Sequence, residues 1–249
     1  MSRPVALISG AGRAAGIGAG IAKALAGDGW DLALTYWPRY DERMPWGHQP
    51  SDIQLLEKEL LLTGAQVLLV PADLECLDST PQVFGAIGKT LGSVSGLVLS
   101  HCESVASGIL DTSIESFDRH FAVNVRASWL LIRAFAGQVP SAGGHIVALT
   151  SDHTVGDIPY GTSKGALDRL VLAAARELAH LRITSNVVNP GPIDTGWMNE
   201  DIRKTTAERQ PTGRIGTPAD VAQVISFLLS PAGAWVNGQL IKADGGFSA

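Results

Sequence analysis

The sequence predicts a single-domain α/β protein with a Rossmann fold, in which helices cover both faces of a doubly wound, seven-stranded parallel sheet. Three observations support this prediction. Short apolar runs alternate with helical patterns along the whole chain, a glycine-rich turn follows the first run, and no stretch has the composition of an interdomain linker. With 249 residues and 45% hydrophobic content, one large core is feasible. We therefore expect a single domain over residues 1–249.

The first strand is expected over residues 4–9, a compact apolar run. A glycine-rich segment over residues 10–20 follows, and a helix begins near Ile21. This order favours a dinucleotide phosphate site, because glycines let the backbone approach a pyrophosphate and a helix N-terminus offers unpaired N–H groups. A tight turn that merely needs small residues is the alternative, and the strand and helix on either side make it the weaker one.

The second strand, residues 31–36, ends without the carboxylate that would hold the adenosine ribose of NAD. Arg13, Arg39 and Arg43 could instead pair with a 2′-phosphate, which predicts NADP(H) as the preferred cofactor over NAD(H). Solvated loop arginines are the alternative interpretation. Residues 37–52 are rich in proline and aromatic side chains, so we expect a long loop beside the adenosine end, neither helix nor strand.

The remaining elements follow from apolar periodicity and from turn residues. A polar segment over residues 194–216, with Trp197 and Met198 as its apolar contacts, is a candidate substrate lid. We expect further helices over about 51–62, 79–91, 113–139, 160–181 and 218–229, and further strands over 65–71, 96–99, 144–149, 184–188 and 239–243.

Tyr160 and Lys164 carry the clearest chemical signal. Residues four apart on a helix project from the same side, so both side chains should point toward one site. A nearby ammonium favours the phenolate and lowers the pKa of a tyrosine, which would let Tyr160 exchange a proton with a carbonyl oxygen or an alcohol. A tyrosine and a lysine at this spacing are also common by chance. The glycine-rich turn, Ser151 ahead of the tyrosine and the strand-ending Asn189-Pro190-Gly191 change that balance.

Composition excludes several other classes of protein. The net charge of −5 argues against a nucleic-acid partner, because proteins that bind nucleic acids usually present a basic face. No apolar run approaches the length of a membrane span, and the N-terminus lacks a signal-peptide layout. Cys76 and Cys102 lack metal-ligand spacing, and Ser100-His101-Cys102-Glu103 has no second cluster to complete a metal site, so we expect none. Reduced thiols and a cytoplasmic location are the expectation.

These motifs, taken in order, resemble the short-chain dehydrogenase/reductase family over residues 5–246, with a general likeness to its 3-oxoacyl-(acyl carrier protein) reductase-like members. The resemblance implies an oxidoreductase that moves a hydride between NADPH and a carbonyl or alcohol substrate, such as a 3-oxoacyl thioester or similar ketone. It also implies a homotetramer or homodimer. The substrate and the physiological direction stay open.

The resemblance also implies roles for individual residues. Tyr160 would be the general acid or base, Lys164 would lower its pKa and hold the nicotinamide ribose, and Ser151 would bind the substrate carbonyl oxygen. Asn124 would link Lys164 to a proton relay through water. The residues expected along the cofactor are Gly10, Gly12, Arg13, Gly16, Ile17, Gly18, Tyr36, Arg39, Asp73, Leu74, Ser100, Tyr160, Lys164, Pro190, Gly191, Ile193 and Thr195.

The sequence departs from the family pattern in four places. The glycine spacing of the first turn leaves open whether Gly10 or a later glycine makes the tight turn. The family's Asn-Asn-Ala-Gly is replaced by residues 99–102, Leu-Ser-His-Cys. The interval between Ser151 and Tyr160 is short, and the segment 37–50 is longer than usual.

Two competing functions follow from these departures. The first is a non-catalytic NADP-binding sensor or scaffold on the same fold, since fold does not dictate function. The second keeps the enzyme but changes the reaction to dehydration or epimerisation.

Overall fold

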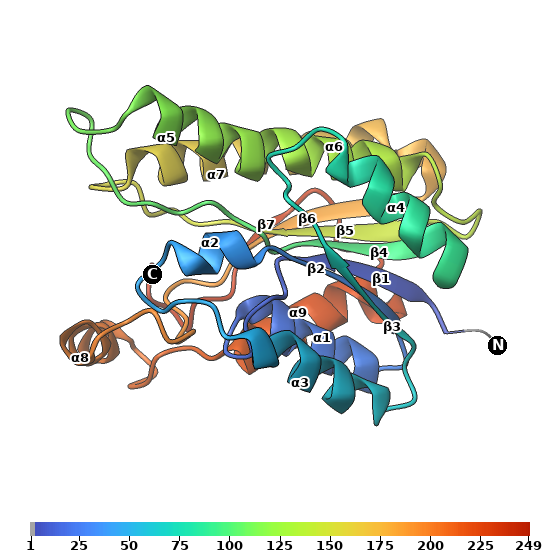
Figure 1. Cartoon of the computed structure of the whole chain (residues 1–249), viewed down its shortest axis with the longest axis horizontal. Helices are drawn as coiled ribbons and strands as arrows, with labels where there is room; N and C mark the ends of the chain where they lie inside the picture. Colours follow the sequence, from blue (N-terminus) through green and yellow to red (C-terminus); the bar gives the residue numbers. More distant parts are fainter. Residues whose placement is uncertain (1–2) are drawn as a thin grey trace.

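The computed structural model describes residues 3–249 and contains one seven-stranded parallel sheet (Figure 1). Its strand order is β3-β2-β1-β4-β5-β6-β7, which confirms the doubly wound Rossmann fold. The strands are β1 (Val5–Ser9), β2 (Asp31–Tyr36), β3 (Val67–Pro71), β4 (Val94–Leu99), β5 (Gly144–Leu149), β6 (Ile183–Asn189) and β7 (Leu240–Lys242).

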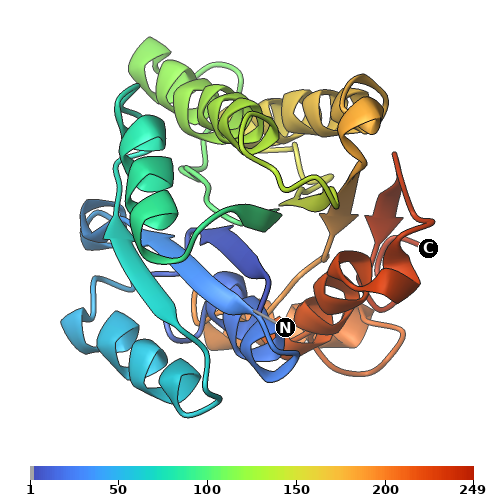
Figure 2. The same ribbon diagram turned by 90° about the vertical axis from the view of Figure 1, so that its right-hand side faces the viewer.

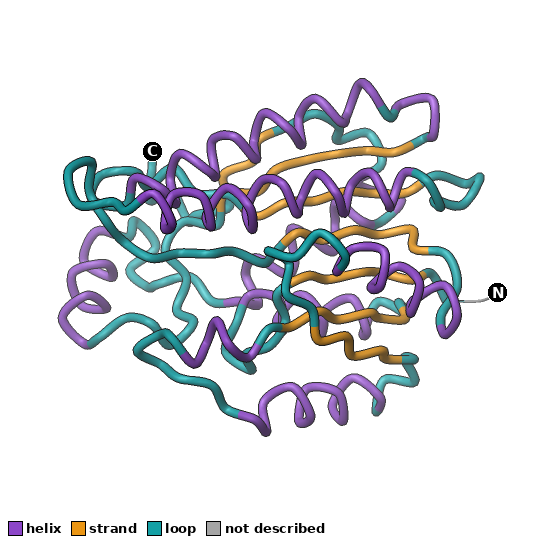
Figure 3. The backbone as a smooth tube through the Cα atoms, turned by 45° about the horizontal axis from the view of Figure 1, so that its top comes forward, coloured by secondary structure: helices purple, strands orange, loops and turns teal. Residues whose placement is uncertain are grey.

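Helices cover both faces of this sheet (Figure 2). One face carries α1 (Ile17–Gly27), α3 (Pro50–Leu61) and α9 (Pro218–Leu229), and the other carries α4 (Ser79–Thr90), α6 (Ala127–Ala136) and α7 (Ile158–Glu177). The tube in Figure 3 shows the strands enclosed between these two layers. The remaining helices are α2 (Pro38–Glu42), α5 (Ile114–His120) and α8 (Glu200–Arg209).

Alternation along β1 shows how one strand serves two cores. Successive side chains of a strand point to opposite faces. Ala6 and Ile8 belong to the core under α1, α3 and α9, whereas Val5 and Leu7 belong to the core under α4, α6 and α7. A strand buried on both faces is therefore apolar throughout, as the compact run at the N-terminus indicates.

One prediction of local structure was wrong, and a second was incomplete. The loop expected over residues 37–52 contains the short helix α2, which begins at Pro38 because proline is pre-set for the first turn of a helix. The long helix expected over residues 113–139 is present as one continuous helix from Ile114 to Ala136, but its middle is a π-helical stretch (Phe121–Arg126) between α5 and α6. Periodicity alone does not register the single extra residue that a π-helical turn absorbs.

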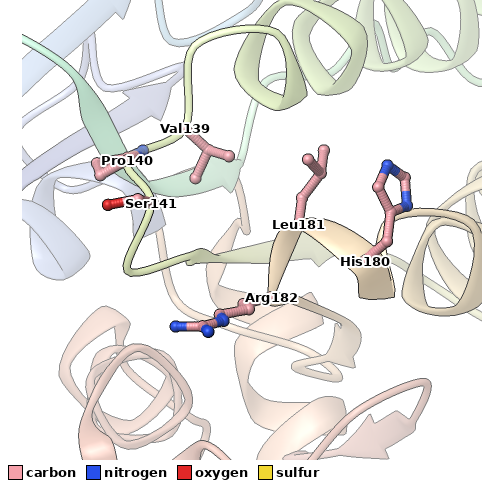
Figure 4. Close-up of a pocket in the computed structure, with 6 residues that line it drawn as sticks. All are labelled: Val139, Pro140, Ser141, His180, Leu181 and Arg182. Atoms are coloured by element: carbon pink, nitrogen blue, oxygen red, sulfur yellow. The ribbon is translucent and has the colours of Figure 1, made fainter.

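The carboxyl ends of the strands lie on the left of Figure 1, and α2 lies beyond them. In such sheets, ligands bind outside this edge. A shallow surface pocket between Val139, Pro140 and His180–Arg182 lies at the opposite edge, where β5 and β6 begin (Figure 4). Its position is unrelated to the residues that the sequence singles out. Within residues 3–249, we find no helix that is long and apolar enough to span a bilayer.

The core under α6 provides a stability test. Phe135 is fully buried between α6 and the sheet, whereas Phe227 on α9 is 45% exposed. Phe135→Ala should lower the free energy of unfolding by about 3–5 kcal/mol, because it removes contacts and leaves a cavity. Phe227→Ala, the same chemical change at the surface, should cost less than about 1 kcal/mol. Urea unfolding followed by circular dichroism measures both, and equal losses would contradict the placement of the core.

Candidate active site

The glycine-rich turn is built around Gly10, which directly follows β1. Gly10 has a φ of +78°, and a Cβ there would lie 2.6 Å from the Cα of His101. Only glycine fits such a position without strain. Gly18 is equally confined, because a Cβ would meet the carbonyl oxygen of Gly10 at 2.7 Å. Gly10 is therefore the residue that makes the tight turn, which settles the question left open by the glycine spacing.

The turn leads directly into helix α1. Gly16 occupies the N-cap and has no side chain with which to satisfy the first N–H groups, starting at Ile17. Such a terminus can accept an anion, because its donors and its dipole both favour negative charge. One donor in the turn is already taken, since the N–H of Ala14 donates to Asp52 Oδ2 at 2.9 Å.

Arg13 is held on three sides rather than free in solution. Its guanidinium donates to the carbonyl oxygen of Thr195 at 2.6 Å and stacks over the ring of Trp46 at 4.4 Å. Its Nε lies 3.9 Å from Asp41 Oδ1, and Trp46 Nε1 donates to the same carboxylate oxygen at 2.9 Å. Arg13 thus joins the glycine-rich turn to α2 and to the segment after β6.

We call residues 37–49 the strap. Besides Asp41 and Trp46, the strap contributes Arg43, whose guanidinium makes two hydrogen bonds to the carboxylate of Glu103, at 3.1 and 2.8 Å. Glu103 follows the end of β4 and is only 3% exposed. Arg43 is therefore paired with Glu103, although its side chain is exposed, whereas the exposed Arg39 places its guanidinium 5.9 Å from the ring of Trp37.

Tyr160 and Lys164 lie on the first turns of α7, as their spacing predicts. Lys164 is buried, its Nζ lies 5.6 Å from the centroid of the Tyr160 ring, and it donates to the carbonyl oxygen of Leu149 at 2.9 Å. Leu149 ends β5, and Ser151 follows two residues later. The structure therefore brings Tyr160, Lys164 and Ser151 to one point on the carboxyl edge of the sheet.

The electrostatics at Tyr160 differ from the sequence expectation. Burial raises the pKa of Tyr160, the neighbouring Cys102 and Asp157 raise it further, and a hydrogen bond with Ser151 opposes them. Burial also lowers the pKa of Lys164, while Cys102 and Asp168 act in the other direction. The expected lowering of the Tyr160 pKa is not found, because desolvation of the phenolate is the largest effect on it.

Asn124 ties this constellation to β4. Its side-chain oxygen accepts from the N–H of Glu103 at 2.7 Å, and its Nδ2 donates to the carbonyl oxygen of Glu103 at 2.9 Å and to Ser163 Oγ at 2.8 Å. Ser163 in turn donates to the carbonyl oxygen of Tyr160 at 2.7 Å. Asn124 is fully buried in the π-helical stretch, and such stretches occur frequently at functional sites.

His101 stands in the segment that replaces the family's Asn-Asn-Ala-Gly, at the position of the alanine. Its Nδ1 lies 2.6 Å from Ser9 Oγ and its Nε2 lies 3.0 Å from the carbonyl oxygen of Val123. The ring therefore joins β1, the end of β4 and the π-helical stretch. Burial lowers the pKa of His101 to about 4, so the ring is neutral at pH 7.

The other predicted residues all follow strand ends on the same edge. Tyr36 ends β2, and Ser100 follows β4 and donates its N–H to Ser9 Oγ at 3.2 Å. Asp73 and Leu74 follow β3; the Asp73 carboxylate accepts from the N–H of Glu75, and Leu74 is buried.

The segment after β6 holds four more of the predicted residues: Pro190, Gly191, Ile193 and Thr195. Gly191 in this segment has a φ of +62°. Gly12 lies against Tyr36, since a Cβ at Gly12 would be 3.1 Å from that side chain.

Comparison with known proteins identifies the family. A family model described as enoyl-(acyl carrier protein) reductase matches residues 10–248. The uncharacterized oxidoreductase YjdA of Bacillus subtilis is 34% identical, with 98% of this chain and 96% of that protein covered. An NADPH-dependent aldehyde reductase-like protein of Arabidopsis thaliana is 32% identical, over 98% of this chain and 93% of its own. The chain belongs to the short-chain dehydrogenase/reductase family.

A solved structure agrees with this assignment. The blue fluorescent protein from a metagenomic library, determined with NADPH, superimposes with a TM-score of 0.87 at 30% identity, covering 99% of this chain and 98% of that one. The chain is therefore an oxidoreductase of the family that acts on carbonyl and alcohol groups. Within residues 3–249, no three histidine, cysteine or acidic side chains cluster in a way that could hold a metal ion.

Sequence reasoning missed two residues of this edge. Glu103 was considered only as a metal ligand, and Ser163 only as part of the stretch between Tyr160 and Lys164. A carboxylate directly after a buried strand needs a cationic partner, and this signal pointed to Glu103. Nothing in the sequence indicates that its partner is Arg43, sixty residues away in the chain.

Burial of a neutral histidine predicts a pH-dependent stability. The unfolded chain binds a proton at His101 near pH 6.5 and the folded chain only near pH 4. Between these values the unfolded state binds more protons, so stability falls as the pH falls, by on the order of 3 kcal/mol from this residue. His101→Asn, which cannot take up a proton, should lose less melting temperature between pH 7 and pH 5 than the parent protein. Equal losses in differential scanning calorimetry would contradict a buried neutral ring.

Proposed function

We propose that this protein is an NADPH-dependent carbonyl reductase. The observation that carries the proposal is the convergence of Tyr160, Lys164 and Ser151 at the carboxyl edge of the sheet, beside the glycine-rich turn. In this proposal Tyr160 donates the proton, Lys164 provides a cation beside it, and the Ser151 hydroxyl binds the carbonyl oxygen. The proposal does not specify the carbonyl substrate. A 3-oxoacyl thioester or similar ketone is the substrate class to test first.

The residues of this edge fit a dinucleotide. Gly10 and Gly18 let the turn pack closely against His101 and against α1, and the uncapped α1 N-terminus presents N–H groups to an anion. We assign the pyrophosphate to Gly10, Gly12, Gly16, Ile17 and Gly18, and the nicotinamide side to Tyr160, Lys164, Pro190, Gly191, Ile193 and Thr195. The adenosine side falls to Arg13, Tyr36, Arg39, Asp73, Leu74 and Ser100.

The NADPH preference rests on two supports. The names of the Arabidopsis relative and of the metagenomic structure both include NADPH. In this chain, Arg13 and Arg39 lie on the turns that follow β1 and β2, and an arginine can pair with a phosphate through two parallel hydrogen bonds. When bound, NADPH supplies the hydride that reduces the carbonyl carbon.

The protein supplies the proton and the geometry. The Tyr160 phenol, whose pKa burial raises, is protonated at neutral pH and is placed to give its proton to the carbonyl oxygen as the carbonyl carbon is reduced. Ser151, whose Oγ is held by the N–H of His153 at 3.1 Å, is placed to donate to the same oxygen as charge develops on it. Lys164 carries the positive charge that stabilises the resulting phenolate.

Two further parts of the proposal concern positioning. Asn124 holds Ser163 and thereby the first turn of α7, and through water it would connect Lys164 to solvent for reprotonation. Residues 194–216, which include α8, act as the substrate lid. The exposed ring of Trp197 contributes apolar surface to that lid.

The proton-transfer step has a direct test. Tyr160→Phe should lower kcat by at least about 100-fold, because the general acid is lost, while NADPH still binds within about threefold of the parent affinity. Absorbance at the NADPH band measures turnover across ketones and 3-oxoacyl thioesters, and calorimetry measures binding. Thr162→Ala, which removes an exposed hydroxyl from the same turn of α7, should leave both unchanged. Retained turnover in Tyr160→Phe would disprove the mechanism.

We also propose that the protein acts as a homo-oligomer in the cytoplasm. The ring of Trp235 is 99% exposed, and Leu240 on the edge strand β7 is 43% exposed. An exposed strand edge with large apolar side chains is a surface that proteins usually cover.

Sedimentation velocity tests this assembly. We expect a dimer or tetramer at micromolar concentration, and Trp235→Glu should shift the distribution toward the monomer, because a charge replaces apolar contact area. A parent protein that sediments only as a monomer would disprove the assembly.

A further inference from the structure

The strap, residues 37–49, lies across the edge where the cofactor is proposed to bind. At one end its Asp41 and Trp46 contact Arg13 of the glycine-rich turn. At the other end its Arg43 reaches Glu103, beyond β1 at the end of β4. Tyr40, next to Asp41 on α2, is mostly buried, with Cys102, Glu103 and Tyr160 among its electrostatic neighbours. The strap therefore bridges the glycine-rich turn and the catalytic residues.

Carboxylates of this chain take the donors that a dinucleotide phosphate would use. Asp41 lies beside the Arg13 guanidinium, and Asp52, just after the strap, accepts from the N–H of Ala14 at 2.9 Å. A carboxylate and a phosphate oxygen satisfy the same N–H and guanidinium donors. One N–H of the turn and one side of the Arg13 guanidinium therefore already face acidic side chains, which a phosphate would have to displace to use these two donors.

One contact is the strongest point of attachment of the strap. The Arg43–Glu103 pair is bidentate, and its carboxylate is buried whereas its guanidinium is partly exposed. Charge-assisted pairs of this geometry are among the strong hydrogen bonds of proteins. Arg43 can be hydrated when the pair opens, while Glu103 keeps its main-chain bonds to Asn124. Opening the pair leaves the buried Glu103 carboxylate without its cation, which favours the closed pair, while the main-chain bonds to Asn124 keep residue 103 in place.

We propose that Glu103 is a positioning residue that latches the strap, through Arg43, in a closed arrangement that excludes the dinucleotide until the latch opens. The proposal rests on the proposed NADPH-dependent function. Opening the latch lifts Asp41 away from Arg13 and frees that guanidinium for a phosphate of the cofactor. The latch thus sets the fraction of molecules that can accept NADPH, and it touches neither the hydride nor the proton.

Glu103→Gln is the sharpest test, because it removes the charge of the latch and keeps the shape and the main-chain bonds of residue 103. The apparent dissociation constant for NADPH should fall by about tenfold, since it scales inversely with the fraction of open molecules. Deuterium uptake of the peptide covering residues 37–49, measured by mass spectrometry without any ligand, should become faster. In turnover assays KM for NADPH should fall more than kcat changes.

Two controls accompany this variant. Lys23→Gln breaks the surface pair between Lys23 and Glu59, 2.6 Å apart on α1 and α3, and should change neither strap exchange nor NADPH affinity. The double variant Arg43→Gln/Glu103→Gln should match Glu103→Gln alone, because both remove the same interaction. Additive effects would show that the two residues act separately and would overturn the latch.

The remaining outcomes separate this proposal from the proposed function. Unchanged strap exchange, or an NADPH affinity that stays equal or weakens in Glu103→Gln, would overturn the latch even if the enzyme turns over normally. Normal NADPH binding with no turnover on any carbonyl compound would overturn the reductase and leave the latch supported. Failure of NADPH to bind to the parent protein and to the variant with an opened strap would overturn both.

Discussion

The side-chain amide of Asn124 is the interaction on which the geometry of the site depends. It satisfies the N–H and the carbonyl of Glu103 and also donates to Ser163, so three segments that meet at the carboxyl edge of the sheet share one buried group. A buried amide with unmet hydrogen bonds is costly, and this cost fixes the relative positions of β4, the π-helical stretch and α7. The positions of Tyr160 and Lys164 on α7 depend on these hydrogen bonds of Asn124.

Burial, which secures this geometry, also sets the protonation states. It keeps the Tyr160 phenol protonated and the His101 ring neutral, and it works against a charged Lys164. Both the Tyr160 phenol and the His101 ring are therefore neutral at pH 7. A sequence argument that counts only the ammonium next to the phenol reaches the opposite sign, because it omits the cost of taking the phenolate out of water.

The sequence was sufficient where the signal is local. The spacing of Tyr160 and Lys164, the glycine-rich turn and the apolar runs predict the fold, the sheet edge and the catalytic candidates, since each depends on neighbours within a few residues. It was insufficient where the pairing is long-range. Nothing near Arg13 indicates that it donates to Thr195, and nothing near Arg43 indicates Glu103. The π-helical turn at Asn124 likewise depends on long-range contacts, because the hydrogen bonds of the Asn124 side chain are made to Glu103 and Ser163 on other segments.

Cofactor preference shows how the two kinds of information combine. The end of β2 lacks the carboxylate that would select NAD, and this absence favoured NADP(H). The fold nevertheless brings a carboxylate close to the glycine-rich turn, because α2 places Asp41 beside Arg13. In this strap position the charges of Arg13 and Asp41 offset each other. Under the proposed opening of the strap, the Arg13 guanidinium would meet a cofactor phosphate without Asp41 beside it, so cofactor preference would depend on strap position.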